Sequence, residues 1–172
     1  MDKETYRVLA SVRMERAIEL VDEAKELLQN ERYKSANNRA FYAMEKTMKA
    51  LLAIKEIDAD SHNGCLRQFN VHYIKERVGG FEPGDYKRIA NAQRIRNVSD
   101  YDDFYIATRE EAEEQIQTAK ELVSRVEEYV QARWKKESEK TVRNAEYLDM
   151  IDRGIAQLSA GNGQEHELNE TD

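Results

Sequence analysis

A stretch near the middle of the chain concentrates side chains that bind phosphates and bases. Residues 86–101 carry four basic side chains against a single acid. Arginine makes planar, two-pronged contacts with phosphate, asparagine both donates and accepts hydrogen bonds, and a tyrosine ring can stack on a base. The pattern is typical of a nucleotide or RNA site. Its candidate residues are Arg94, Arg96, Asn97, Asp100 and Tyr101.

A structural interpretation of the same residues is equally open on spacing alone. Arg96 and Asp100 stand four residues apart, so they could form an ordinary ion pair at the end of a helix. Exposed pairs of this kind contribute little to stability.

Other chemistry is poorly supported by the sequence. His62 and His72 are ten residues apart and have no ligand set of recognisable spacing around them, so we predict no metal site. Cys65 has the apolar neighbours Leu66 and Phe69, which favours a packed thiol over a reactive one. The chain has no glycine-rich phosphate loop, and we expect no cofactor.

Apolar residues recur at helical spacing along most of the chain and predict an all-α helical bundle. One proline and seven glycines in 172 residues also favour long helices with short connections. Thr108 is a suitable cap for the fifth helix, which fades at about 133–140. We expect a loop at 99–105 and helices at about 3–29, 33–55, 62–78, 84–98, 109–133 and 145–158.

Charge divides the chain into two predicted parts. The formal net charge of −7 splits into −1 for residues 1–136, with 24 basic and 25 acidic side chains, and −6 for residues 137–172. We therefore predict a helical domain at 1–136 and a C-terminal extension at 137–172, made of a short helix and an acidic, flexible end. The nearly neutral first part leaves an anionic ligand open.

Bulk features predict a cytoplasmic protein. The only cysteine excludes an internal disulfide and suits a reducing compartment. No apolar run approaches the ~18 residues of a membrane span, and the first ten residues lack the apolar stretch of a signal peptide.

Three short motifs give the sequence a recognisable family resemblance. They are the run Asn38–Ala43 (NRAFYA), the pattern Ser61-His62-x-Gly64, and the pattern Arg96-x-x-Ser99-Asp100-Tyr101. Together, over roughly residues 5–135, they resemble small stand-alone prokaryotic HEPN-domain proteins. The resemblance implies an up-and-down bundle of four to five helices that forms a homodimer, with Tyr42 joining the candidate ligand-binding residues.

The resemblance also implies partners and an activity. Many HEPN proteins pair with a minimal nucleotidyltransferase as toxin–antitoxin modules, and the toxic members are metal-independent ribonucleases. Their motif is an arginine, a polar residue and a histidine, which maps here to Arg96, Asn97 and Tyr101. Tyrosine, with a pKa of about 10, is a poor base at neutral pH, whereas histidine titrates near 6.5. We therefore expect a binding module, with an endoribonuclease as the alternative.

Two further expectations follow from the resemblance. In some family pairs the partner modifies a tyrosine near the motif, which makes Tyr101 and Tyr105 candidate modification sites. Residues 144–170 weakly resemble the C-terminal segments of small antitoxins that wrap a toxin. The second alternative is accordingly a structural adaptor that binds a toxin or antitoxin partner through residues 137–172. The residues themselves favour a helix packed back on the bundle, with a disordered end.

Overall fold

The computed structural model describes residues 2–59 and 61–159 and confirms the all-α bundle. No strand occurs in these two ranges. The described residues fall into two compact units that meet between Val130 and Gln131, and each unit is described by itself. The helices are α1 (Lys3–Gln29), α2 (Tyr33–Ile54), α3 (His62–Phe69), a π-helical turn η1 (Asn70–Lys75), a 3-10 turn η2 (Val78–Gly80), α4 (Pro83–Tyr101) and α5 (Arg109–Ser159).

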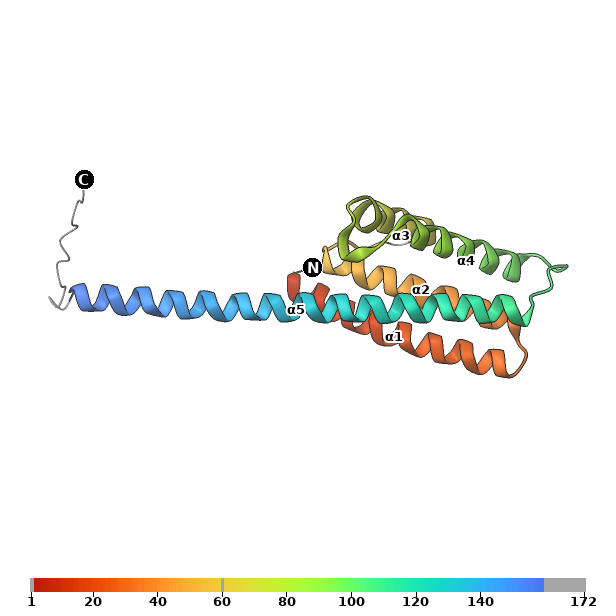
Figure 1. Ribbon diagram of the computed structural model, residues 1–172, viewed down its shortest axis with the longest axis horizontal. Coiled ribbons are helices and arrows are strands. Elements are labelled where there is room, and N and C mark those ends of the chain that lie inside the picture. The colour runs from red at the N-terminus through yellow and green to blue at the C-terminus, as the bar shows by residue number, and fades with distance from the viewer. Residues whose placement is uncertain (1, 60, 160–172) are drawn as a thin grey trace, which may run out of the picture. The chain divides into compact units, whose positions relative to one another are not determined.

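The first unit is an up-and-down bundle (Figure 1), in which α1, α2, α4 and the first part of α5 lie alongside one another. The connection between α1 and α2 is short, and these two helices make the most extensive contact between any two of the elements from α1 to α4. Small residues permit such closeness because helix backbones approach further where side chains are short. Ala36, Ala40 and Ala43 of α2 are all fully buried.

A cluster of aromatic rings closes the end of the bundle where α3, η1 and η2 meet. The Tyr73 ring stacks on Phe69 and meets the edge of Phe81, with ring centroids 5.9 and 5.8 Å away. The Tyr73 hydroxyl donates a hydrogen bond to the backbone carbonyl of Leu51 in α2. Cys65 is fully buried in α3, and burial raises the pKa of its thiol to about 12, so this is a packed cysteine.

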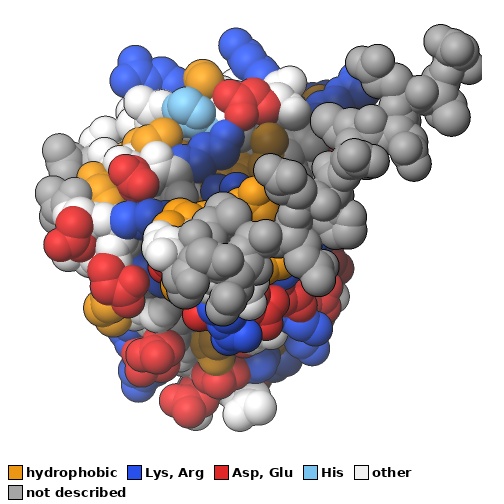
Figure 2. Space-filling view, turned by 90° about the vertical axis from the view of Figure 1, so that its left-hand side faces the viewer, with side chains coloured by type: hydrophobic (Ala, Val, Ile, Leu, Met, Phe, Trp, Pro, Cys, Tyr) orange, Lys and Arg blue, Asp and Glu red, His pale blue; other side chains and the backbone are white. Residues whose placement is uncertain are grey.

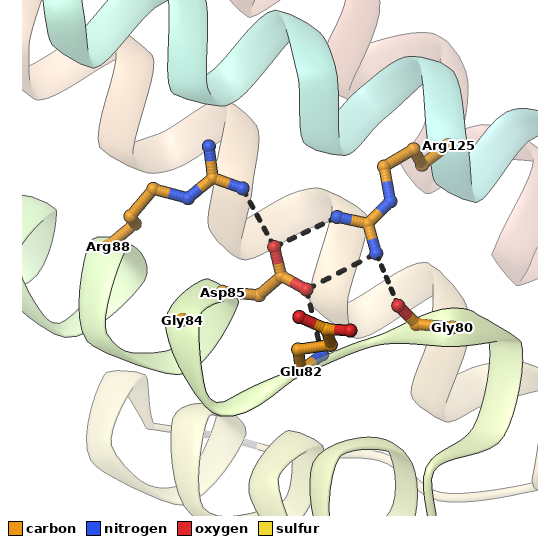
Figure 3. A pocket seen from close by; sticks show the side chains of 6 residues that line it. All are labelled: Gly80, Glu82, Gly84, Asp85, Arg88 and Arg125. Carbon is orange, nitrogen blue, oxygen red and sulfur yellow. Dashed lines mark hydrogen bonds and ion pairs between the residues drawn. The ribbon is translucent and has the colours of Figure 1, made fainter.

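A buried carboxylate joins the beginning of α4 to α5. Asp85 lies in the first turn of α4 and is only 6 % exposed (Figure 3). It accepts two hydrogen bonds from Arg125 of α5, at 2.9 and 3.2 Å, one from Arg88 at 2.8 Å and one from the backbone N–H of Glu82. Arg125 also donates to the backbone carbonyl of Gly80. These contacts hold α4 in place beside a cavity of about 610 Å³.

The pKa of Asp85 reflects this environment. Burial alone would raise it, but the hydrogen bonds from Arg125, from the Glu82 backbone and from Arg88 outweigh burial and hold the pKa below its ordinary value. Asp85 is therefore ionised at neutral pH and fixes the position of α4, the helix that carries the Arg96 motif.

Two expected breaks are absent from the structure. The loop predicted at 99–105 begins only after Tyr101, because Asp100 pairs with Arg96 one turn earlier and extends α4. The helix predicted at 145–158 is not separate, because α5 continues without interruption to Ser159. Residues 133–140 contain neither glycine nor proline and consist mostly of good helix formers, so nothing there ends the helix. The acidic end from residue 160 lies outside the described residues.

The surface carries charges of both signs. On the face shown in Figure 2, Lys and Arg side chains are interspersed with Asp and Glu side chains. Among the described residues, no helix is both long enough and apolar enough to cross a membrane.

Candidate functional site

A row of polar contacts joins α2 to α4, and we call it the polar seam. On α2, Lys34, Asn38 and Tyr42 follow one another at four-residue spacing and therefore share one face of the helix. Asn38 donates a hydrogen bond to Asp100. Lys34 reaches the backbone carbonyl of Asp102 at 3.4 Å. Tyr42 accepts a hydrogen bond from Arg96, which brings residues 54 positions apart into contact.

Arg96 is the centre of the polar seam, and its side chain is only 12 % exposed. One terminal nitrogen donates to the Tyr42 hydroxyl at 2.7 Å and pairs with Asp100 at 2.9 Å. The guanidinium also lies 5.4 Å from the ring centroid of Tyr42 and 5.7 Å from that of Tyr101. Burial alone would lower the pKa of Arg96, but the hydrogen bond to Tyr42 and the nearby charges outweigh burial and raise the pKa, so the cation is permanent.

The polar seam leaves several buried polar atoms without a hydrogen-bond partner among the described residues. They include Oδ1 of Asn38, Nε of Arg96 and Oγ of Ser99, three residues that lie together along α2 and the end of α4. Buried polar atoms are rarely left unpaired in folded proteins, because each costs on the order of 1–3 kcal/mol. Local rules are broken in this way most often at functional sites.

Large apolar side chains are exposed beside the polar seam. Tyr101, the last residue of α4, is 78 % exposed, and Phe104 in the following loop is 94 % exposed. Ile106 is also exposed. A cation with exposed aromatic rings next to it can hold a phosphate while the rings stack on bases. A cavity of about 420 Å³, lined by Tyr33, Lys34 and Tyr105 among others, lies on the same loop.

The structure brings most of the predicted site residues together. Arg96 contacts Tyr42, Asp100 and Tyr101 as described above, and Asn97 accepts a 3.2 Å hydrogen bond from Arg96. Arg94 is exposed, and its guanidinium donates to Asn91, one turn earlier on α4.

The two candidate modification sites differ in their surroundings. The Tyr101 side chain is largely exposed. The Tyr105 hydroxyl donates to the carboxylate of Glu111, which also accepts a 2.8 Å hydrogen bond from Asn37. Both tyrosines thus have a polar partner, since the Tyr101 side chain is hydrogen-bonded to Arg96, and the two differ mainly in that Tyr101 is the more exposed.

Sequence reasoning missed the residues that extend the polar seam. From the sequence, Asn38 is only part of the Asn38–Ala43 motif, and Glu45 has no predicted role. Glu45 is 4 % exposed and accepts a hydrogen bond from His62 of α3 at 2.8 Å. The available signal was an acid between Met44 and Met48, on the apolar face of α2.

Metal ligation finds no support in the described part of the chain. Across residues 2–59 and 61–159, no group of three or more His, Cys, Asp or Glu side chains is arranged to hold a metal ion.

Comparisons with known proteins agree with the all-α helical bundle. The HEPN domain family matches residues 10–129. A "UPF0332 protein" of Thermotoga maritima is 32% identical over 117 residues, which cover 67% of this chain and 86% of that protein. Two proteins of Methanocaldococcus jannaschii, named "Putative toxin MJ0142" and "Putative toxin MJ0605", are 30% and 33% identical, cover 68% and 66% of this chain, and are themselves covered to 78% and 82%. The chain therefore belongs to the HEPN domain family.

Proposed function

We propose that this protein is the HEPN module of a toxin–antitoxin or defence system and binds RNA or a nucleotide at the polar seam. The observation that carries the proposal is the partly buried Arg96, held by Tyr42 and Asp100 beside the exposed Tyr101 ring. The toxin names of the two M. jannaschii relatives support the system to which we assign it. We further propose that it acts in the cytoplasm.

The same proposal includes two kinds of protein partner. We propose a homodimer, because the exposed side chains of Tyr101, Phe104 and Ile106 offer an apolar surface next to the site. We also propose a nucleotidyltransferase-type partner that modifies Tyr101, since its side chain is the more exposed of the two candidates. Tyr105 is the weaker candidate because it is hydrogen-bonded to Glu111.

Replacing Arg96 by alanine is expected to weaken RNA binding about tenfold or more, because a charge-assisted contact to phosphate contributes roughly 1.5–3 kcal/mol. Fluorescence anisotropy with a labelled single-stranded RNA and with labelled ATP measures the effect. Arg153→Ala is the matched control, since Arg153 also pairs with an acid four residues away but lies on the exposed second half of α5. Its binding should equal that of the unmodified protein.

A second variant tests how a phosphate would enter. Asp100 competes with any phosphate for Arg96, so Asp100→Asn is expected to strengthen binding and to steepen its loss with salt. Equal binding by the unmodified protein and Arg96→Ala, or no binding by either, would rule out the site.

Sedimentation as a monomer at tens of micromolar would rule out the proposed homodimer.

The second half of α5 favours a second candidate function, an adaptor that holds a toxin or antitoxin partner through residues 137–172. Between Gln131 and Ser159 the helix exposes several large apolar side chains, namely those of Val142, Tyr147, Leu148, Met150 and Ile155. An amphipathic helix of this kind can lie in the groove of a partner protein.

Affinity purification with and without residues 137–172 tests the adaptor. We expect at least one protein to be lost from the purified material when the segment is removed, because its apolar side chains would form the contact. The double variant Leu148→Glu/Ile155→Glu keeps the length of the chain and should lose the same protein. An identical set of co-purified proteins in all three cases would exclude this function.

A further inference from the structure

A histidine with a buried carboxylate behind it lies next to the polar seam. His62 is the first residue of α3, where the Ser61 side chain caps the helix by accepting a hydrogen bond from the backbone N–H of Gly64 at 3.0 Å. A Cβ atom at position 64 would lie 2.8 Å from the Ser61 hydroxyl oxygen, so a larger residue there would disturb the cap. The motif Ser61-His62-x-Gly64 thus fixes the backbone that carries the imidazole.

Glu45 fixes the orientation of the His62 imidazole. The carboxylate lies in α2, is almost completely buried, and is 2.8 Å from Nδ1 of His62. Because a carboxylate only accepts hydrogen bonds, this contact in the neutral imidazole places the proton on Nδ1 and leaves Nε2 as a proton acceptor. The His62 side chain is 39 % exposed, so the imidazole is within reach of a ligand.

Charge balance does not require a histidine at this position. Lys49, one turn further along α2, already lies 3.2 Å from the same Glu45 oxygen. The other charged groups on this side are Arg13 of α1, which donates to the backbone carbonyl of Lys49, and Asp58, which pairs with Arg13 at 2.6 Å. Lys49 thus balances the charge of Glu45 without the imidazole.

Tyr42 connects the imidazole to Arg96. The His62 ring centroid lies 6.0 Å from that of Tyr42, whose hydroxyl accepts the hydrogen bond from Arg96. A second contact between α4 and α3 is the hydrogen bond that Gln93 of α4 donates to Asn63 at 2.6 Å. A proton acceptor and a phosphate-binding cation therefore flank one tyrosine, although the residues that carry them are 34 positions apart in the sequence.

We propose that His62, oriented by Glu45, is the catalytic base of a metal-independent RNA cleavage at the polar seam, in which Arg96 holds the scissile phosphate. The proposal rests on the proposed binding of RNA at this site. It assigns to His62 the proton transfer for which Tyr101 is unsuited.

The reaction needs no component beyond RNA and water. Nε2 of His62 removes the proton of the ribose 2′-hydroxyl, and the 2′-oxygen forms a bond to phosphorus. The bond from phosphorus to the 5′-oxygen breaks, and that oxygen leaves with the electron pair and takes a proton from water. The products are a 2′,3′-cyclic phosphate and a 5′-hydroxyl, and the imidazolium returns its proton to the solvent. Arg96 balances the charge that develops on the phosphate.

Cleavage of an end-labelled RNA in excess EDTA tests the proposal with the full chain. The unmodified protein is expected to leave 2′,3′-cyclic phosphate ends, and His62→Gln to cleave about 10²–10⁴-fold more slowly, the usual contribution of a general base. Glu45→Gln should lose less activity and shift the acid limb of the pH–rate curve. His72→Gln is the matched control, because His72 also faces a glutamate, Glu76, at 3.7 Å but lies on η1.

Chemical rescue distinguishes a catalytic role of His62 from a purely structural one. Added imidazole should restore cleavage to His62→Ala, which no effect on folding would produce. No cleavage by the unmodified protein, or cleavage by His62→Gln within twofold of it, overturns the proposal. Anisotropy distinguishes this failure from failure of the proposed function, because His62→Gln should bind RNA as tightly as the unmodified protein does, whereas Arg96→Ala should not.

Discussion

Replacing Asp85 by alanine is expected to lower the free energy of unfolding by about 3 kcal/mol, at the upper end of the range for a hydrogen bond to a charged group, because the carboxylate is buried while its two arginine partners are partly exposed. The carboxylate is the common partner of Arg88 and Arg125, so its removal leaves two cations beside each other with no acid between them (Figure 3). It also removes the acceptor for the backbone N–H of Glu82 at the start of α4. Urea unfolding followed by helical circular dichroism measures the loss.

Glu121 supplies a matched control for Asp85. It pairs with the same Arg88 at 2.9 Å but is exposed, and exposed pairs contribute less than about 1 kcal/mol. We therefore expect Glu121→Ala to cost less than a third of the loss in Asp85→Ala. Equal losses of unfolding free energy in the two variants would contradict a larger stabilising role for the Asp85 cluster, that is, Asp85 with Arg88 and Arg125.

The contribution of ionised Asp85 to stability should also be measurable as the pH is lowered. The folded-state pKa of Asp85 lies below its ordinary value, so its ionised form stabilises the fold at all pH values above the unfolded pKa of about 3.9. That stabilisation is lost as the pH falls from about 4 through the folded-state pKa. The unmodified protein should therefore lose stability below about pH 4 more steeply than Asp85→Asn does.

The Asp85 cluster matters for the candidate site because both lie on α4. Arg96 stands eleven residues after Asp85, a distance of about 16 Å along a helix that rises 1.5 Å per residue. A helix of that length is rigid, so fixing one of its ends restricts the position of the other. Fixing the first turn of α4 to α5 therefore helps to hold Arg96 against Tyr42 of α2.

The sequence was most informative where structure is local. Helical periodicity located α1 and α2 nearly to the residue, because it depends only on spacing within one segment. The end of α4 was wrong because Asp100 is stabilised by Arg96 and by Asn38, a contact between residues 62 positions apart. Periodicity within a single helix does not reveal which face of α4 meets α2.

Because sequence patterns reveal neighbours within one segment and not contacts between helices, they identified some site residues and missed others. Arg96, Asn97, Asp100 and Tyr101 are neighbours in sequence, so one motif identified them together. Glu45 and His62 belong to different helices, and each has an ordinary structural explanation by itself. Only their 2.8 Å contact, beside Tyr42, makes them a candidate pair for proton transfer.

Replacing Phe41 by alanine is expected to cost about 3–5 kcal/mol, the range for removing a buried aromatic ring. Phe41 is almost completely buried in α2, beside Tyr42 of the polar seam. Its ring meets the edge of the His62 imidazole at a centroid distance of 5.5 Å, so the ring supports both the core and the site. Thermal unfolding should show a midpoint on the order of 10 °C lower.

Two variants separate these roles of Phe41. Val12→Ala, at an exposed apolar position on α1, should change the free energy of unfolding by less than about 0.5 kcal/mol, and a larger change would mean that the assay responds to apolar truncation anywhere. Phe41→Leu keeps an apolar group in the core but removes the aromatic ring that contacts His62. It should stay folded and move the imidazole proton signals of His62 in an NMR spectrum, because the aromatic ring that shields them is gone. Unmoved signals in a folded Phe41→Leu would mean that Phe41 does not position the imidazole, and that Glu45 and Tyr42 hold His62 without it.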